Sequence, residues 1–288
     1  MNLIVRQLTQ IANECRTDKG TVPGMGHGYT PLYELLLTPF REREIDLLEI
    51  GLSAGGPEVM GRADRAVTDF PSIRMWREFF PKAHITGVDI SDFSRFETTW
   101  FKFFRADCGS AEQLHNVAEL SGSQDLIVDD GSHAPFHQQL TLCSLFPILK
   151  PGGLYFIEDL NWQPEAYEKS LPSVPRTDRL LADFVRTGRF ENTGAIERSR
   201  WDAVAKRIAN IFLFDEDYLY EYRRLYNIRA GLQPEIASYV DIRFPRRLLK
   251  PGYLRRLVED LRTFLNTAVG RVGPSRRPRI KLAVIQAR

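Results

Sequence analysis

The run QDLIVDDG, at residues 124–131, decides the fold of this 288-residue chain. Its apolar centre is too short for a helix and does not alternate with polar residues, which is typical of a strand covered on both faces of a parallel sheet. Three further runs have the same character and also end at a glycine or an acid: IDLLEIG at 45–51, HITGVDI at 84–90 and GLYFIEDL at 153–160. We therefore predict four parallel strands.

Helical patterns separate these runs. Apolar residues recur at helical spacing over 72–80, 110–120 and 134–149, and LKPGG at 149–153 stops the last helix and turns the chain into the next strand. Strands that alternate with helices predict an α/β fold, a doubly wound sheet with right-handed crossovers.

The segment before the first strand contains two short helical patterns, at 3–15 and 31–37. The glycine-rich stretch TDKGTVPGMGHGYT joins them, and its composition predicts a loop on which His27 and Tyr29 can contact a ligand. We interpret residues 1–44 as an N-terminal helical cap with a covering loop.

The segment after the fourth run is polar. Residues 161–200 hold three prolines, which favours a lid over the strand ends rather than core. Two further strands are predicted at 208–222 and 279–286. If these two strands pair as an antiparallel edge of the sheet, the core comprises residues 45–222, with 279–288 as its last strand.

The predicted core then has a basic insertion, residues 223–278, in which apolar spacing predicts a helix over 253–269. The net charge of +2 hides this asymmetry, because residues 221–288 hold 16 Lys and Arg against 5 Asp and Glu, and the first 220 hold 23 against 32. This asymmetry argues against a uniformly basic nucleic-acid binder. The basic tail is interpreted as a solvated face, a dimer surface, or an attraction to an anionic acceptor or membrane surface.

The three cysteines, Cys15, Cys108 and Cys143, are far apart and form no CxxC pair, so no disulfide framework or zinc ribbon is expected. The N-terminus lacks the pattern of a signal peptide, and no apolar stretch approaches the roughly 18 to 20 residues that span a bilayer. We expect a cytoplasmic protein without a transmembrane segment.

A glycine-rich turn follows the first predicted strand, and Asp89 ends the second. This pattern is typical of nucleotide or nucleoside sites, in which the acid accepts hydrogen bonds from ribose. A nicotinamide dinucleotide is disfavoured because GxGxxG is absent and 38 residues separate Gly51 from Asp89, where about 20 are usual. The carboxylate of Glu49 would repel pyrophosphate but accepts a ribose or a cationic sulfonium. S-adenosylmethionine is therefore favoured over a dinucleotide.

Carboxylates also end the other two strands, in DDGSH at 129–133 and EDLN at 158–161. Adjacent strand ends bring these like charges together, and a hard divalent cation, Mg²⁺ rather than zinc, resolves the repulsion. His133 can act beside it as a base, and His137 is an alternative metal ligand or second base. Alternatively, the same carboxylates only cap helix N-termini and have a structural role. Trp162 either stacks on the face of a sugar or packs against other side chains of the protein.

Together LLEIG, SIRMWREFFPKAHITGVDI, RADCGS, DLIVDDGSH and LKPGGLYFIEDLN resemble the magnesium- and S-adenosylmethionine-dependent sugar O-methyltransferases of the mycinamicin 2''-O-methyltransferase type. TDKG followed by HGYTPLYELL resembles the cofactor-covering segment of that family. The resemblance implies a class I methyltransferase (Rossmann-like) fold. It also implies functional residues, namely metal ligands Asp130, Glu158 and Asp159, base His133, and cofactor contacts at Glu49, Gly51, Asp89 and Asp107. To these we add Ser53, Asp129 and Tyr29 as expected cofactor residues, and Asp130 as a catalytic residue.

The expected function is methyl transfer from S-adenosylmethionine to a sugar hydroxyl of a glycoside, saccharide or glycolipid precursor, with Mg²⁺ on two adjacent hydroxyls and a histidine base. Two alternatives remain, a catechol or phenol O-methyltransferase and a non-catalytic S-adenosylmethionine-binding assembly protein. The expected partner is a saccharide or glycoside acceptor and not a nucleic acid. A homo-oligomer and a peripheral membrane contact through the basic insertion are also expected.

Overall fold

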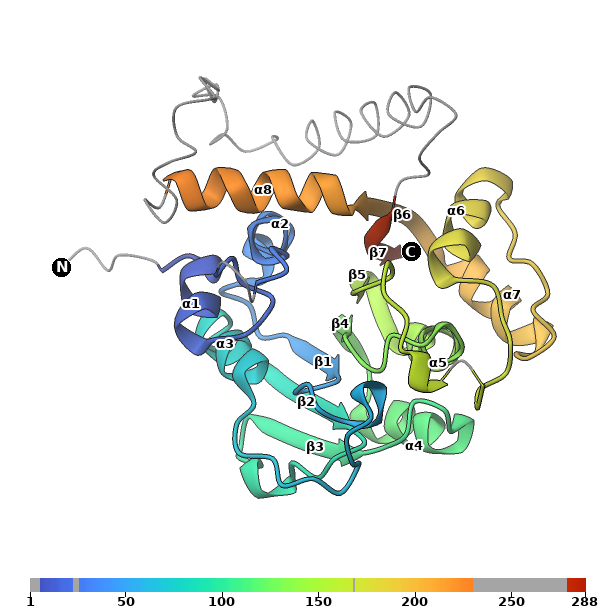
Figure 1. Cartoon of the computed structure of the whole chain (residues 1–288), viewed down its shortest axis with the longest axis horizontal. Coiled ribbons are helices and arrows are strands. Elements are labelled where there is room, and N and C mark those ends of the chain that lie inside the picture. The colour runs from blue at the N-terminus through green and yellow to red at the C-terminus, as the bar shows by residue number, and fades with distance from the viewer. Residues whose placement is uncertain (1–5, 23–25, 168, 230–278) are drawn as a thin grey trace. The chain divides into compact units, whose positions relative to one another are not determined.

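The computed structural model describes residues 6–22, 26–167, 169–229 and 279–288. A seven-stranded sheet with strand order β3-β2-β1-β4-β5-β7-β6 is its centre (Figure 1). The strands are β1 Asp46–Ile50, β2 His84–Asp89, β3 Phe101–Arg105, β4 Gln124–Asp129, β5 Leu149–Ile157, β6 Ile208–Asp215 and β7 Ile280–Ala287. Strands β1 to β5 pair in parallel, whereas β7 is antiparallel to both β5 and β6. The predicted doubly wound sheet with an antiparallel edge is confirmed.

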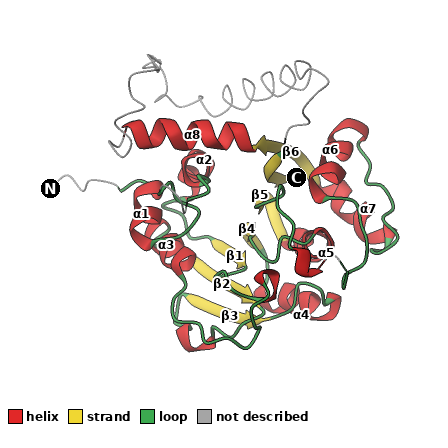
Figure 2. Ribbon diagram, viewed as in Figure 1, coloured by secondary structure: helices red, strands yellow, loops and turns green. Residues whose placement is uncertain are grey.

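Helices cover both faces of this sheet (Figure 2). In one group, α1 Leu8–Cys15 packs against both α2 Thr30–Leu37 and α3 Pro71–Phe79. The other comprises α4 Ala111–Ser121, α5 Pro135–Leu145, α6 Thr177–Thr187 and α7 Arg198–Arg207. A last helix, α8 Glu216–Arg229, follows β6. Since all six residues of β4 are buried between the layers, the apolar run that predicted this strand is explained by coverage on both faces.

Two details of the strand prediction were wrong. Strand β3 is not among the predicted strands. It is an outer strand with an alternating burial pattern in which Lys102 is exposed, and its run is too short and too polar on one face to be recognised. The strand predicted over 208–222 ends at Asp215. The Asp215 carboxylate accepts a hydrogen bond of 2.7 Å from the Tyr218 amide, and this N-cap starts α8 inside the predicted strand.

The segment predicted to be a lid, 161–200, contains core residues. Leu181 in α6 is fully buried, and so is Trp201 in the following helix α7; both belong to the hydrophobic cluster beneath α5. A lid over the strand ends therefore stays a prediction only for residues 161–176, which precede α6. Most of the predicted basic insertion 223–278, with its helix at 253–269, lies outside the described residues. None of the helices that the structure describes combines the length and the apolar character of a membrane span.

The topology creates a crevice between β1 and β4. From β1 the chain moves outward to β2 and β3, and then returns to β4 and continues to β5 in the other direction, so the strand order reverses between β1 and β4. Ligands bind at such switch points, outside the carboxyl ends of the strands. The two strand ends are joined closely here, because the Asp130 amide donates a 2.9 Å hydrogen bond to the Ile50 carbonyl.

Gly51 makes this close approach possible. Its φ of +80° lies in the left-handed region, and a Cβ on it would collide with the carbonyl oxygen of Asp130. Gly122 has a similar φ of +70° but no atom within 4 Å of its Cβ position. A side chain at Gly122 would therefore cost only backbone strain, whereas a side chain at Gly51 would cost the same strain and a steric clash in addition.

We predict that Gly51→Ala lowers the free energy of unfolding by at least about 2 to 4 kcal/mol, since backbone strain and overpacking add. The matched variant Gly122→Ala should lose only about 1 to 2 kcal/mol, from strain alone. Urea denaturation of both variants measures the difference. Equal losses would contradict the close packing of the β1 and β4 ends.

Candidate functional site

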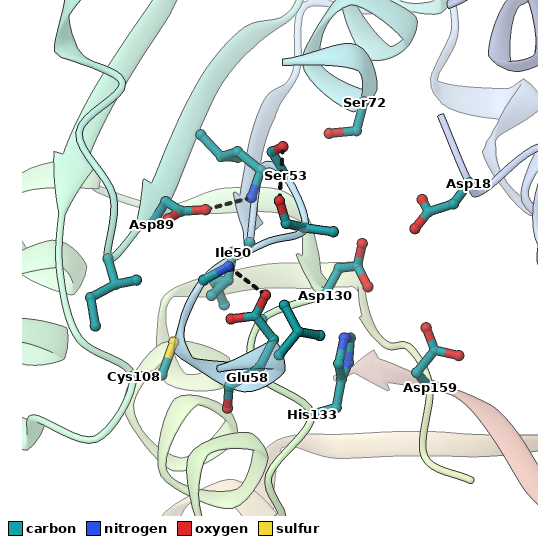
Figure 3. Close-up of a pocket in the computed structure, with 18 of the residues that line it drawn as sticks. Asp18, Ile50, Ser53, Glu58, Ser72, Asp89, Cys108, Asp130, His133 and Asp159 are labelled. Carbon is teal, nitrogen blue, oxygen red and sulfur yellow. Dashed lines mark hydrogen bonds between the residues drawn. The ribbon is translucent and has the colours of Figure 1, made fainter. Parts of the chain in front are cut away.

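A pocket of ≈ 730 Å³ opens at the carboxyl ends of β1, β2 and β4 (Figure 3). This volume lies within the range of cofactor and small-molecule sites. In the close-up, Asp89 and Cys108 lie on one side of the pocket, and Asp130, His133 and Asp159 on the other. The pocket therefore has two chemically different ends.

The first end is built around Asp89 and the glycine turn after β1. Both carboxylate oxygens of Asp89 accept backbone hydrogen bonds, one from the Leu52 amide at 2.9 Å and one from the Ser91 amide at 2.7 Å. Burial raises the pKa of Asp89, and these amide donors oppose the rise. The predicted cofactor residues Gly51, Ser53, Asp89 and Asp107 all line the pocket.

The second end is the cluster of Asp130, His133 and Asp159, whose ligand atoms all lie within 4.8 Å of one another. The backbones of His133 and Asp159 have φ values of 60° and 51°, a left-handed conformation that non-glycine residues rarely adopt. Such strain is often found at functional sites. The side chain of Asp18, which the sequence analysis did not single out, points toward this cluster (Figure 3).

The groups of the cluster have shifted pKa values. Burial lowers the pKa of His133, so its imidazole is neutral at pH 7 and can accept a proton. Burial also raises the pKa of Asp130 to about 7, against the charge of Lys19. Burial opposes ionisation of Asp159 as well, but the hydrogen bond and charge of His27, at 3.1 Å, outweigh it and hold the pKa of Asp159 well below its usual range.

A buried lysine lies behind the cluster. The ammonium group of Lys19 is 2.5 Å from Asp130 Oδ2, 3.0 Å from Glu158 Oε1 and 3.4 Å from Glu49 Oε1, and the side chain is 1% exposed. Burial alone would lower the pKa of Lys19, but the charges of Asp130, Glu158 and Glu49 raise it well above its usual value. Lys19 is not among the predicted site residues, and its only signal in the sequence is its place in the TDKG motif.

Lys19 accounts for two predicted site residues that do not line the pocket. Glu158, predicted as a metal ligand, accepts a 2.7 Å hydrogen bond from the Tyr33 hydroxyl and is paired with Lys19. Glu49, predicted to bind the cofactor, is fully buried and accepts a 2.8 Å hydrogen bond from Ser72. The structure brings neither into the Asp130–His133–Asp159 cluster.

Two more predicted cofactor residues point elsewhere. The hydroxyl of Tyr29 donates a 2.9 Å hydrogen bond to Asp159 Oδ1 and is fully buried, so Tyr29 holds Asp159 and does not reach the pocket wall. The Asp129 carboxylate accepts hydrogen bonds from Thr141 and Tyr155 beneath α5. Adjacent residues at a strand end point in opposite directions, which explains why Asp130 lines the pocket and Asp129 does not.

The second end fits a divalent cation in its chemistry. Asp130 and Asp159 offer the carboxylate oxygens that Mg²⁺ prefers, and their separation from His133 is within the reach of one ion. Lys281, which the sequence analysis also missed, approaches Asp159 to 3.3 Å from β7. With Lys19 and His27, it offsets the charge of the buried carboxylates.

Known proteins with similar sequences are O-methyltransferases. No protein-family model matches the chain. It is 37% identical to a mycinamicin VI 2''-O-methyltransferase of Micromonospora griseorubida over 140 residues, 48% of this chain and 32% of that protein. It is also 37% identical to an 8-demethyl-8-alpha-L-rhamnosyl tetracenomycin-C 2'-O-methyltransferase of Streptomyces olivaceus over 135 residues, 47% of this chain and 34% of the relative. The chain thus matches about one third of the length of these curated relatives.

A solved structure has the same fold. The MycE methyltransferase of the mycinamycin biosynthetic pathway, in complex with Mg and SAH, matches 73% of this chain and 53% of its own, with 25% identity and a TM-score of 0.58. The chain therefore has the class I methyltransferase fold, as predicted, and its similarity to sugar O-methyltransferases is confirmed.

We predict that Lys19→Met, measured by urea denaturation with a chelator present, lowers the free energy of unfolding by about 3 to 5 kcal/mol, because it leaves buried carboxylates without a cation. The matched variant Lys150→Met removes a lysine that is 36% exposed and paired with Asp46 and Asp125 at 2.7 Å. It should lose only about 1 kcal/mol or less. Similar losses in both variants would show that Lys19 does not hold the carboxylates together.

Proposed function

We propose that this chain is an S-adenosylmethionine-dependent O-methyltransferase that transfers a methyl group to a sugar hydroxyl of a glycoside, saccharide or glycolipid precursor. One observation carries the proposal. The Asp130–His133–Asp159 cluster lines the same pocket as Gly51, in the turn after β1, and Asp89, at the end of β2. A nucleoside at one end and a cation with a base at the other allow the methyl donor and the acceptor hydroxyl to meet between them.

The first end suits the methyl donor. Asp89 retains acceptor capacity for ribose hydroxyls, and the absence of a side chain at Gly51 lets the ligand approach the backbone. Asp107, at the end of the neighbouring strand β3, can accept a hydrogen bond from the adenine amine. The acidic character of the lining also favours a cationic sulfonium over an anionic pyrophosphate.

The second end suits the acceptor hydroxyl. Mg²⁺, when bound there, supplies a positive charge that stabilises a developing alkoxide. Asp130 and Asp159 would hold it, and Glu158 stays a predicted third ligand. His133 is neutral and takes the hydroxyl proton as the oxygen attacks the methyl carbon, whose bond to sulfur breaks. Because a hard cation prefers oxygen, we assign His133 as the base and not as a ligand.

Trp162 is placed to contact the acceptor sugar. Its side chain lines the pocket next to His133, with the two ring centroids 5.3 Å apart, and 42% of its surface is exposed. An exposed indole beside the base offers an apolar face to a sugar ring. A saccharide or glycoside acceptor is thus the proposed partner, and the homo-oligomer, the membrane contact and the cytoplasmic location remain predictions.

We predict that His133→Ala lowers turnover by about 10²- to 10⁴-fold, the usual contribution of a general base. Mg²⁺ and S-adenosylhomocysteine affinities, measured by calorimetry, should stay unchanged, because the base contacts neither. His115→Ala, at a surface histidine 65% exposed on α4, is the matched control and should keep full activity. A large loss of Mg²⁺ affinity in His133→Ala would make His133 a ligand, and unchanged turnover would reject it as the base.

Transfer of a radiolabelled methyl group from S-adenosylmethionine to a panel of sugars and glycosides, with and without chelator, tests the function directly. We expect labelled product from at least one glycoside or saccharide, and its loss when the divalent cation is removed. Labelling of catechols alone would contradict the sugar acceptor. Cofactor binding without transfer to any acceptor class would contradict an enzyme, and full activity after exhaustive chelation would remove the metal from the mechanism.

A further inference from the structure

The loop that follows β1 places the carboxylate of Glu58 in the wall of the pocket. Glu58 belongs to the single turn η2 Pro57–Val59. Its Oε1 atom accepts hydrogen bonds from the amides of Gly55 at 3.0 Å and Gly56 at 2.8 Å. A Cβ on Gly56 would lie 2.6 Å from the other carboxylate oxygen, so glycine at position 56 makes room for this group. The carboxylate is therefore fixed by the backbone of its own loop.

The charge of Glu58 has no counter-ion in the part of the chain that the structure describes. Its carboxylate is hydrogen-bonded to backbone amides, and no described basic side chain forms an ion pair with it. The other acids of the pocket differ in this respect, because Asp130 is paired with Lys19 and Asp159 with Lys281. Glu58 is half-buried and lines the pocket. A positively charged group of a ligand would therefore be its natural partner.

Glu58 lies between the two ends of the pocket. Burial raises the pKa of Asp89, and the charge of Glu58 is among those that add to this rise. Burial lowers the pKa of His133, and the charge of Glu58 is among those that oppose it. Because charge–charge interactions weaken with distance, one carboxylate that acts on both groups is near both. In the view of Figure 3, Glu58 lies between Cys108 and His133.

The middle of the pocket is where the proposed reaction changes the charge of the cofactor. If the ribose contacts Asp89 and the acceptor hydroxyl lies at His133, the sulfonium and its methyl group lie between them. The oxygen forms a bond to the methyl carbon as the carbon–sulfur bond breaks, and the hydroxyl proton passes to His133. Sulfur keeps the electron pair of the broken bond and becomes a neutral thioether. An attraction to a carboxylate here acts on the methyl donor and not on the demethylated product.

We propose that Glu58 is a specificity-determining residue that binds the sulfonium by charge and makes the pocket prefer S-adenosylmethionine to S-adenosylhomocysteine. Glu49 is the acid predicted to accept the sulfonium, but its side chain is fully buried and paired with Lys19. Glu58 supplies a carboxylate that faces the pocket instead. The weaker hold on the product favours its release after transfer. The inference rests on the proposed function, because it requires that the pocket bind an S-adenosyl compound.

The test compares ligands that differ in charge at one position, in the full-length protein and without an acceptor. Calorimetry measures the Kd of S-adenosylmethionine, S-adenosylhomocysteine and sinefungin, which carries an ammonium in place of the methyl group and so separates the charge from the methyl. We expect the wild type to bind both cationic ligands at least about tenfold more tightly than S-adenosylhomocysteine.

Glu58→Gln should lose most of this preference, while its affinity for S-adenosylhomocysteine stays within about twofold of the wild-type value. The reason is that the glutamine oxygen still accepts the two amide hydrogen bonds that hold the loop, so only the charge is removed. Glu112→Gln, at an exposed glutamate in the first turn of α4, is the matched control and should keep the wild-type preference.

Equal affinity of the wild type for S-adenosylmethionine and S-adenosylhomocysteine would overturn the proposal without the need for a variant. A Glu58→Gln protein that keeps the wild-type ratio of affinities would also overturn it. Equal weakening of every ligand in that variant belongs to this second outcome, since it would leave Glu58 only a structural role in its loop. Failure of the wild type to bind any S-adenosyl compound would reject the proposed function itself, a separate outcome, and this inference with it.

Discussion

The structure depends on the neutralisation of carboxylates that parallel strands bring together at one edge of the sheet. Glu49, Asp130 and Glu158 come from the ends of β1, β4 and β5, and each lies within 3.4 Å of the Lys19 ammonium. Buried like charges repel strongly in a medium of low dielectric constant. A buried cation is therefore needed for these strand ends to lie side by side, and it comes from the segment between α1 and α2.

The same contacts attach the N-terminal segment to the end of the pocket that Asp130 and Asp159 line. Lys19 binds Asp130, and His27 and Tyr29 both contact Asp159. Asp130 and Asp159 are thus oriented by the N-terminal segment, in which Lys19 and Tyr29 lie behind the pocket wall and His27 lines the pocket. Positioning of this kind is typical of sites that must hold a metal in a fixed geometry.

Much of this fold could be predicted from particular residues. The runs that became β1, β2, β4 and β5 are apolar on both faces, and the acids at their ends identified Asp89, Asp130 and Asp159 as pocket residues. Parallel strands place their carboxyl ends together, so the sequence positions were enough to predict this convergence.

The remainder depends on the direction of individual side chains. Asp129 and Asp130 are adjacent and chemically identical. Only the tertiary packing shows that Thr141 and Tyr155 donate hydrogen bonds to Asp129, which turns its carboxylate away from the pocket. Likewise no spacing rule brings Lys19 or Lys281 to the strand ends, because these contacts join segments far apart in the sequence. The prediction of a strand through residue 222 is wrong for a local reason. The apolar pattern continues past Asp215, but Asp215 caps the N-terminus of a helix and ends the strand there.

The central claim is the proposal that the carboxylates of Asp130 and Asp159 hold a divalent cation at one end of the pocket whose other end would bind the methyl donor. The most direct measurement is anomalous scattering from crystals of the protein soaked in Mn²⁺ with S-adenosylhomocysteine. The account predicts one strong peak coordinated by the carboxylates of Asp130 and Asp159. A strong peak elsewhere in the chain, or no peak at these two carboxylates at saturating Mn²⁺, would contradict it.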